Sequence, residues 1–190
     1  MYSSNLLRWS GVAAMVGGAL IVVKGVFIAL SAGDPSLVPP AMLLQALGLL
    51  GLHARLEGRG GLLGRIGVSL AYLAVAASIV NLVYLGLDVA PEDPNSPALV
   101  NFTYMAAFLG ILVGLLLLGF ATLRARVMSA RLRAVPLAVG LLWLPLMGIT
   151  WFLGEGLVVA GLAWVLLGYL IWSGTGGSVR GPARARSASR

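Results

Sequence analysis

The stretch ALVNFTYMAAFLGILVGLLLLGFATLRAR, residues 98–126, decides the fold class of this chain. From Ala98 to Leu123 it contains no charged residue, and it ends at Arg124 and Arg126. At 1.5 Å per residue such a run is longer than the hydrocarbon core of a bilayer, which is about 30 Å thick. The stretch therefore predicts a transmembrane helix whose last turn meets a positively charged boundary.

Five more apolar runs share this character. The six runs are Trp9 to Ser31, Ser36 to Ala54, Ile66 to Leu87, Ala98 to Leu123, Ala134 to Leu153 and Leu157 to Ser173. The chain is 59% hydrophobic and 10% charged, and its mean hydropathy is +0.99. That composition leaves too few polar residues to cover a soluble globule of 190 residues. We therefore expect an all-α membrane bundle with six transmembrane helices and short loops.

The charged residues predict the orientation of this bundle. The 13 basic residues are Lys24 and 12 arginines, and the arginines lie before the first run, after the second, after the fourth and after the sixth. The gaps on the other side contain no Arg or Lys, and they hold five of the six acids: Asp34, Asp88, Glu92, Asp93 and Glu155. By the positive-inside rule, both termini are expected in the cytoplasm.

The composition also bears on function classes. The net charge of +7 could indicate a nucleic-acid partner, but the basic residues border apolar runs, where anionic lipids attract them, and no nucleic-acid motif is present. Without cysteine there is no disulfide, thiolate metal site or dithiol chemistry. No phosphate loop, carboxylate cluster or metal-ligand spacing occurs, so we predict no cofactor and no metal.

The runs also predict an internal repeat. Arg8, Arg65 and Arg133 stand directly before the first, third and fifth runs. The same offsets align Phe27-Ile28-Ala29, Tyr84-Leu85-Gly86 and Phe152-Leu153-Gly154, and the even runs share Leu49-Leu50-Gly51-Leu52, Leu117-Leu118-Gly119-Phe120 and Leu166-Leu167-Gly168-Tyr169. We interpret this as three helical hairpins, about residues 8–56, 65–124 and 133–173, within one membrane domain of residues 1–173. Residues 174–190 are predicted to be a disordered basic cytoplasmic tail.

Small residues indicate how such helices pack. Pairs spaced four apart, such as Ala14 with Gly18 and Gly110 with Gly114, remove side-chain bulk from one helix face. Packing within the chain is favoured over homo-oligomerisation, which stays open. Pro145 lies inside the fifth run and is expected to kink it.

Lys24 is the strongest candidate for a functional residue. It lies within the first run, about 10 Å below the outer surface, where an ammonium group needs snorkelling, water or a partner. Counted along their own runs, Gln45, Asn81 and Tyr104 reach a similar depth. We predict an outward-facing polar pocket lined by Lys24, Gln45, Asn81, Tyr84, Asp88 and Tyr104. Asp88 is the first candidate for the counter-charge of Lys24, and Glu155 and Asp34 are the others.

Simpler readings compete with the pocket. Lys24 could snorkel along a lipid-facing groove, and the amides of Gln45 and Asn81 could only hydrogen-bond neighbouring helices. An intramembrane hydrolase built on Ser69 and His53 is disfavoured, because Ser69 is expected to bond the carbonyl of Arg65 instead. A cleaved signal peptide is disfavoured too, since the first run is too long for a signal core and Lys24 interrupts it.

The opening Arg8-Trp9-Ser10-Gly11-Val12-Ala13-Ala14 with Gly17-Gly18 resembles the start of uncharacterised small polytopic membrane proteins of GC-rich bacteria. The resemblance is confined to this N-terminal segment and implies no activity. The preference for arginine over lysine, with abundant Ala, Gly and Leu, is likewise typical of GC-rich genomes, so a bacterial plasma membrane is expected.

Two functions fit these observations. The first is binding or transport of a small polar or anionic amphiphile through the pocket around Lys24. The second is a non-catalytic membrane scaffold, or an accessory subunit of a membrane complex, that contacts a membrane protein partner. No enzymatic activity is expected in either case.

Overall fold

The computed structural model describes residues 4–33, 35–56, 58–89, 95–128, 132–153 and 155–173, and in that part of the chain it contains six α-helices and no strand. The helices are α1 (Ser4–Ala29), α2 (Val38–Arg55), α3 (Gly61–Gly86), α4 (Ala98–Ala125), α5 (Val135–Leu153) and α6 (Glu155–Ser173). The predicted all-α class is therefore confirmed. The tail predicted over residues 174–190 lies outside the described residues.

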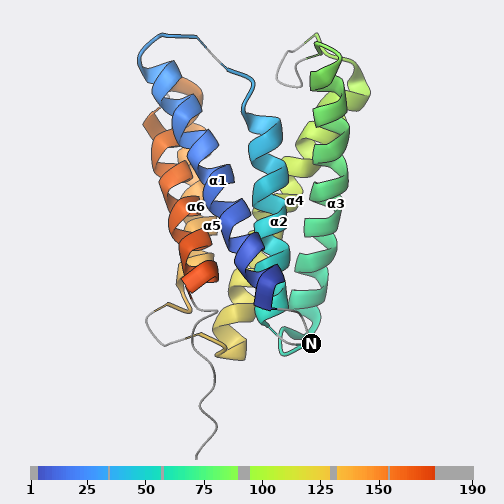
Figure 1. Cartoon of the computed structure of the whole chain (residues 1–190), viewed down its shortest axis with the longest axis vertical. Helices are drawn as coiled ribbons and strands as arrows, with labels where there is room; N and C mark the ends of the chain where they lie inside the picture. The colour runs from blue at the N-terminus through green and yellow to red at the C-terminus, as the bar shows by residue number, and fades with distance from the viewer. Residues whose placement is uncertain are drawn as a thin grey trace, which may run out of the picture.

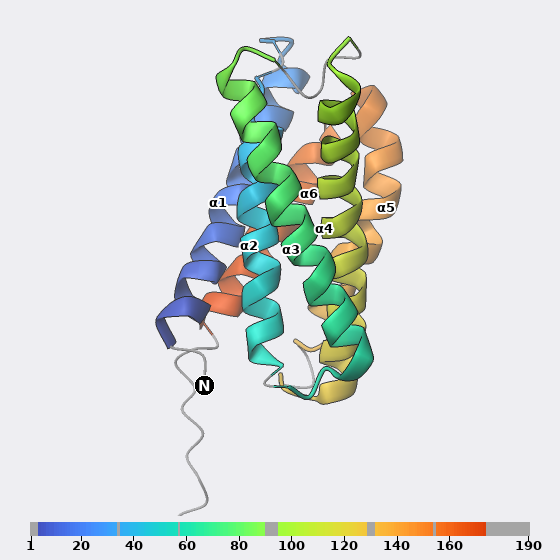
Figure 2. The ribbon, with the colours of Figure 1, turned by 90° about the vertical axis from the view of Figure 1, so that its right-hand side faces the viewer.

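The helices run alternately up and down and form one bundle (Figures 1 and 2). Each helix packs against the next along the chain, and α1 also packs along α6, so the two ends of the chain close the bundle. α2 lies in the middle and contacts α1, α3, α4 and α6. Consequently α2 carries the most continuous buried surface, while α1 and α3 share no extensive interface among the described residues.

The seam between α1 and α6 is made by glycines. A Cβ added at Gly18 would lie 2.6 Å from the carbonyl oxygen of Gly161, and one added at Gly168 would lie 2.6 Å from the carbonyl oxygen of Gly11. Contacts this short require that the two backbones touch, because any side chain at these positions would separate the helices.

The small pairs found in the sequence also pack within the chain. Gly17 meets the backbone of Ala41 in α2, and a Cβ at Gly48 would lie 2.6 Å from the Cβ of Ala14. Gly110 and Gly114 meet the backbone of α3 in the same way. The prediction that these small faces serve intramolecular packing is confirmed.

Four of the described helices, α1, α3, α4 and α6, are long and apolar enough to cross a membrane. α2 is less hydrophobic because it contains two prolines, a glutamine, a histidine and an arginine in 18 residues. In α5 the side chains are described as far as Leu146. Pro145, at which a kink was predicted, lies inside this helix.

The described arginines lie at one end of the bundle, because they sit at the starts of odd helices and the ends of even ones. We call this the arginine end. Its helices are joined by a hydrogen bond of 2.6 Å from Nη2 of Arg55, at the end of α2, to the carbonyl oxygen of Ile171 in the last turn of α6. A cation at a helix C-terminus also complements the dipole of that helix.

The hairpin repeat stays a prediction. Two of the shared glycines pack on a helix outside their own hairpin, since Gly119 of α4 meets Leu137 of α5 and Gly168 of α6 meets Gly11 of α1. The third, Gly51, instead meets Ser10 of α1. The side chain of Phe152, which the repeat compares with Phe27 and Tyr84, lies outside the described residues.

Candidate functional site

Lys24 points into the bundle. Its side chain is 4% exposed, and its Nζ donates a hydrogen bond of 3.3 Å to the carbonyl oxygen of Pro35, which precedes α2. The neighbouring Gly25 packs on Val158 of α6, so Lys24 lies where α1, α2 and α6 approach one another. This burial contradicts the alternative in which Lys24 lies along a lipid-facing groove.

The hydrogen bond to Pro35 differs from the predicted pairing of Lys24 with Asp88. Asp88 follows the end of α3, is exposed, and has a left-handed backbone with φ of 64°. α2 lies between α1 and α3, which separates Lys24 from the α3 side of the bundle (Figure 1). The other proposed counter-charges, Asp34 and the side chain of Glu155, lie outside the described residues.

Asn81 forms a second polar centre, between α3 and α4. Its side chain is fully buried, and its Oδ1 accepts a hydrogen bond of 3.0 Å from the hydroxyl of Thr103. The Nδ2 of Asn81 and the hydroxyl of the fully buried Ser78, one turn away, have no hydrogen-bond partner. Thr103 was missed in the sequence, although antiparallel pairing of the third and fourth runs brings it opposite Asn81.

Gln45 does not share the depth of Lys24. A Cβ added at Gly17 would lie 3.2 Å from Cγ of Gln45. Gly17 precedes Lys24 by about two turns, so Gln45 lies about 10 Å deeper than the backbone of Lys24. The prediction of one polar layer is wrong here, because counting along separate helices ignores their tilt and vertical shift. Gln45 is fully buried, and neither atom of its amide has a partner.

Two tryptophans lie at the level of Gln45. Trp164 packs beside Gly18, and the adjacent Gly17 is the residue that meets Gln45. The ring of Trp164 lies edge-on to the ring of Trp143, with the two ring centroids 6.3 Å apart. Trp143 also stacks on Phe108 of α4 at 5.4 Å. Both indole N–H groups are buried without a hydrogen-bond partner. The centre of the bundle therefore combines an amide and two indole donors that the protein itself leaves unpaired.

The remaining predicted site residues lie nearer the surface. Tyr84 and Tyr104 are half-buried, and Tyr104 packs against the hydrophobic core. That these two tyrosines share a cavity with Lys24 stays a prediction.

Towards the arginine end the interior is mostly apolar, although Nδ1 of His53 and Nε of Arg133 are buried there without a hydrogen-bond partner. It is filled by leucines that are at most 1% exposed: Leu49, Leu52, Leu56, Leu115 and Leu118. The buried hydroxyl of Thr122 at this end is satisfied by the carbonyl oxygen of Leu118, at 2.7 Å. Unpaired side-chain amides and hydroxyls are thus found in the centre and in the half of the bundle away from the arginines.

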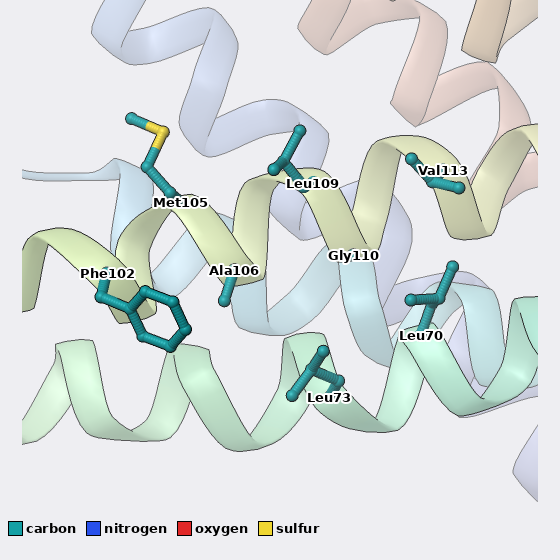
Figure 3. Close-up of a pocket in the computed structure, with 8 residues that line it drawn as sticks. All are labelled: Leu70, Leu73, Phe102, Met105, Ala106, Leu109, Gly110 and Val113. Atoms are coloured by element: carbon teal, nitrogen blue, oxygen red, sulfur yellow. The ribbon is translucent and has the colours of Figure 1, made fainter. Parts of the chain in front are cut away.

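A shallow apolar groove lies on the outside of α3 and α4 (Figure 3). Gly110 and Ala106 form its floor, because they present almost no side chain between the two helices. The groove is lined by Leu70, Leu73, Phe102, Met105, Ala106, Leu109, Gly110 and Val113, and by none of the six predicted pocket residues.

The residues considered for a hydrolase form no dyad. The hydroxyl of Ser69 donates to the carbonyl oxygen of Arg65 at 3.1 Å, as predicted, and Ser69 is exposed on α3. His53 lies beside Gly64, whose added Cβ would be 4.0 Å from Nδ1 of His53. In the described part of the chain no hydrogen bond joins Ser69 to His53.

No family model matches this chain, and no curated protein or solved structure matches it either. Its function must therefore be argued from its own residues.

Proposed function

We propose that this chain is a plasma-membrane protein in which all six helices cross the bilayer, with both termini in the cytoplasm. Four helices have the length and hydropathy for this, and α2 and α5 run beside them in the same bundle (Figure 2). The described arginines lie at one end, which the positive-inside rule assigns to the cytoplasm. The opposite end then faces outward.

Within this frame we propose that the outward half of the bundle binds a small polar or anionic amphiphile. The observation that carries this proposal is a set of buried polar groups without protein partners: both atoms of the Gln45 amide, the Ser78 hydroxyl and Nδ2 of Asn81. Each unpaired group costs roughly 1–3 kcal/mol, so a bound polar molecule would stabilise the bundle by satisfying those within its reach. The Gln45 amide lies on the same side of α2 as Lys24, whereas Asn81 lies between α3 and α4.

Lys24 supplies the charge in this proposal. Its ammonium group is buried inside the bundle and donates a hydrogen bond to the carbonyl oxygen of Pro35. An anionic head group would pair with Lys24, while the apolar part of the ligand would lie between helices. The leucines near the arginine end close the other half, so transport would require a second conformation in which they separate.

The test is mass spectrometry of molecules that co-purify with the protein in native nanodiscs. Lys24→Met keeps the length of the side chain and removes its charge, so we expect the variant to fold and to lose the co-purifying ligand. Thr122→Val is the matched control, because its hydroxyl is already satisfied within α4 and lies near the arginine end.

Retention of the same ligand by a folded Lys24→Met protein would contradict the binding proposal. The alternative is a membrane scaffold or accessory subunit, which the apolar groove on α3 and α4 favours, since a helix of a partner could lie in it. In that case Met105→Trp, which fills the groove, should release a stoichiometric protein partner, whereas Lys24→Met should not.

A further inference from the structure

The arginine end of the α1–α6 seam brings two exposed aromatic rings to the membrane-facing surface. A Cβ at Gly11 would lie 2.7 Å from the backbone nitrogen of Trp172, so α1 and α6 are in backbone contact here. Tyr169 and Trp172 are 50% and 42% exposed, and their ring centroids are 6.0 Å apart. The phenol and the indole therefore form one aromatic surface along the last turns of α6.

Arg8 lies on the same outer flank. On α1, Ser10 faces Gly51 of α2, while Gly11 faces α6. Successive residues of an α-helix are rotated by about 100° around its axis, so Arg8 is rotated by about 60° from Gly11, on the side away from Ser10. Arg8 therefore lies on the outside of the bundle, next to α6. Arg8 is exposed. We call Arg8, Tyr169 and Trp172 the seam surface.

The chemistry of this surface fits a phospholipid. Tryptophan and tyrosine are favoured at the head-group level of a bilayer, where the ring is buried and the N–H or O–H reaches polar groups. A guanidinium group binds phosphate with two parallel hydrogen bonds. Asp88 and the backbone of Glu155, the acids that the structure describes, belong to the opposite end of the bundle.

We propose that the seam surface binds an anionic phospholipid of the cytoplasmic leaflet. The lipid phosphate pairs with Arg8, and its glycerol region and acyl chain lie against Trp172 and Tyr169. Charge complementarity selects an anionic over a zwitterionic head group, because the arginine end carries an excess of positive charge. This inference rests on the proposed membrane orientation, but it is independent of the ligand proposed at Lys24.

Native mass spectrometry of the full chain in detergent tests the proposal. The protein is stripped of lipid and then mixed with equal amounts of phosphatidylglycerol and phosphatidylcholine. We expect wild type to retain phosphatidylglycerol preferentially, and the double variant Arg8→Gln with Trp172→Leu to lose that retention by about tenfold or more, since one charge-assisted hydrogen bond alone is worth about that much. Arg124→Gln is the matched control, because Arg124 is also exposed at the arginine end, in the last turn of α4.

Equal losses in the double variant and in the Arg124→Gln control would overturn the proposal, because they would show a general charge effect and no site. Absence of head-group preference in wild type would also overturn it, as would displacement of the lipid by inorganic phosphate alone. Thermal unfolding of each variant confirms that it is folded. Both variants should keep any ligand that depends on Lys24, so failure of this inference is distinguishable from failure of the binding proposal.

Discussion

Single residues explain why the interior of this bundle is unusual. A helix in lipid satisfies its own backbone, so the exceptions are polar side chains such as Lys24, Gln45 and Asn81, which lie inside the bundle at 4% exposure or less. Lys24 and Asn81 find at least one partner each, in Pro35 and Thr103. Gln45 finds none, which makes it the residue whose removal is most informative.

Gln45→Met should raise the stability of the ligand-free protein. Methionine has a similar length and no polar atoms, so the change removes two unsatisfied groups, and we expect a gain of about 1–3 kcal/mol in the free energy of unfolding in detergent. Leu49→Ala, one turn away in the same helix, should instead lose about 2–5 kcal/mol, because it opens a cavity. If Gln45→Met were as destabilising as Leu49→Ala, the amide would have to be satisfied within the protein.

At the scale of elements, the contact between α1 and α6 depends on glycine. These two helices come from opposite ends of the chain, yet their backbones meet at Gly11, Gly18, Gly161 and Gly168. Dispersion between close backbones holds helices together in lipid, where the hydrophobic effect no longer does.

Gly161→Ala should destabilise the bundle by roughly 1–3 kcal/mol, the usual effect of overpacking. Its new Cβ would lie 2.5 Å from the carbonyl oxygen of Gly18, and rigid backbone cannot move aside. Gly86→Ala is the control, since a Cβ there meets nothing within 4 Å. Thermal unfolding in detergent measures both, and equal stabilities for the two variants would contradict the backbone contact.

At the scale of the whole molecule, the alternation of arginine-rich and acidic gaps predicts the topology. Reporter fusions after Arg59, Arg131 and Arg190 should report cytoplasm, and fusions after Pro35, Pro94 and Glu155 should report the exterior. Fusions on either side of α2 and α5 are the most informative, because these two helices are not among the four clear membrane-spanning candidates. A single inverted reporter would rule out six crossings.

The sequence by itself determined the helical class, the approximate bounds of the six helices and the segregation of arginines to one end. These properties depend on local hydropathy and on the alternation of direction between consecutive helices, both of which can be read from the chain. It also predicted the Ser69 hydrogen bond, because that partner lies one turn away on the same helix.

Only the tertiary structure decided which helices are neighbours and which polar groups meet. The tilt and vertical shift of the helices place α2 at the centre and close α1 against α6. They also let Lys24 reach Pro35 while Gln45 lies about 10 Å deeper. In a chain of Leu, Ala and Gly, apolar faces surround every helix, so hydropathy does not select partners. The selection comes from the places where glycines let two backbones touch, and these become visible only when both helices are in place.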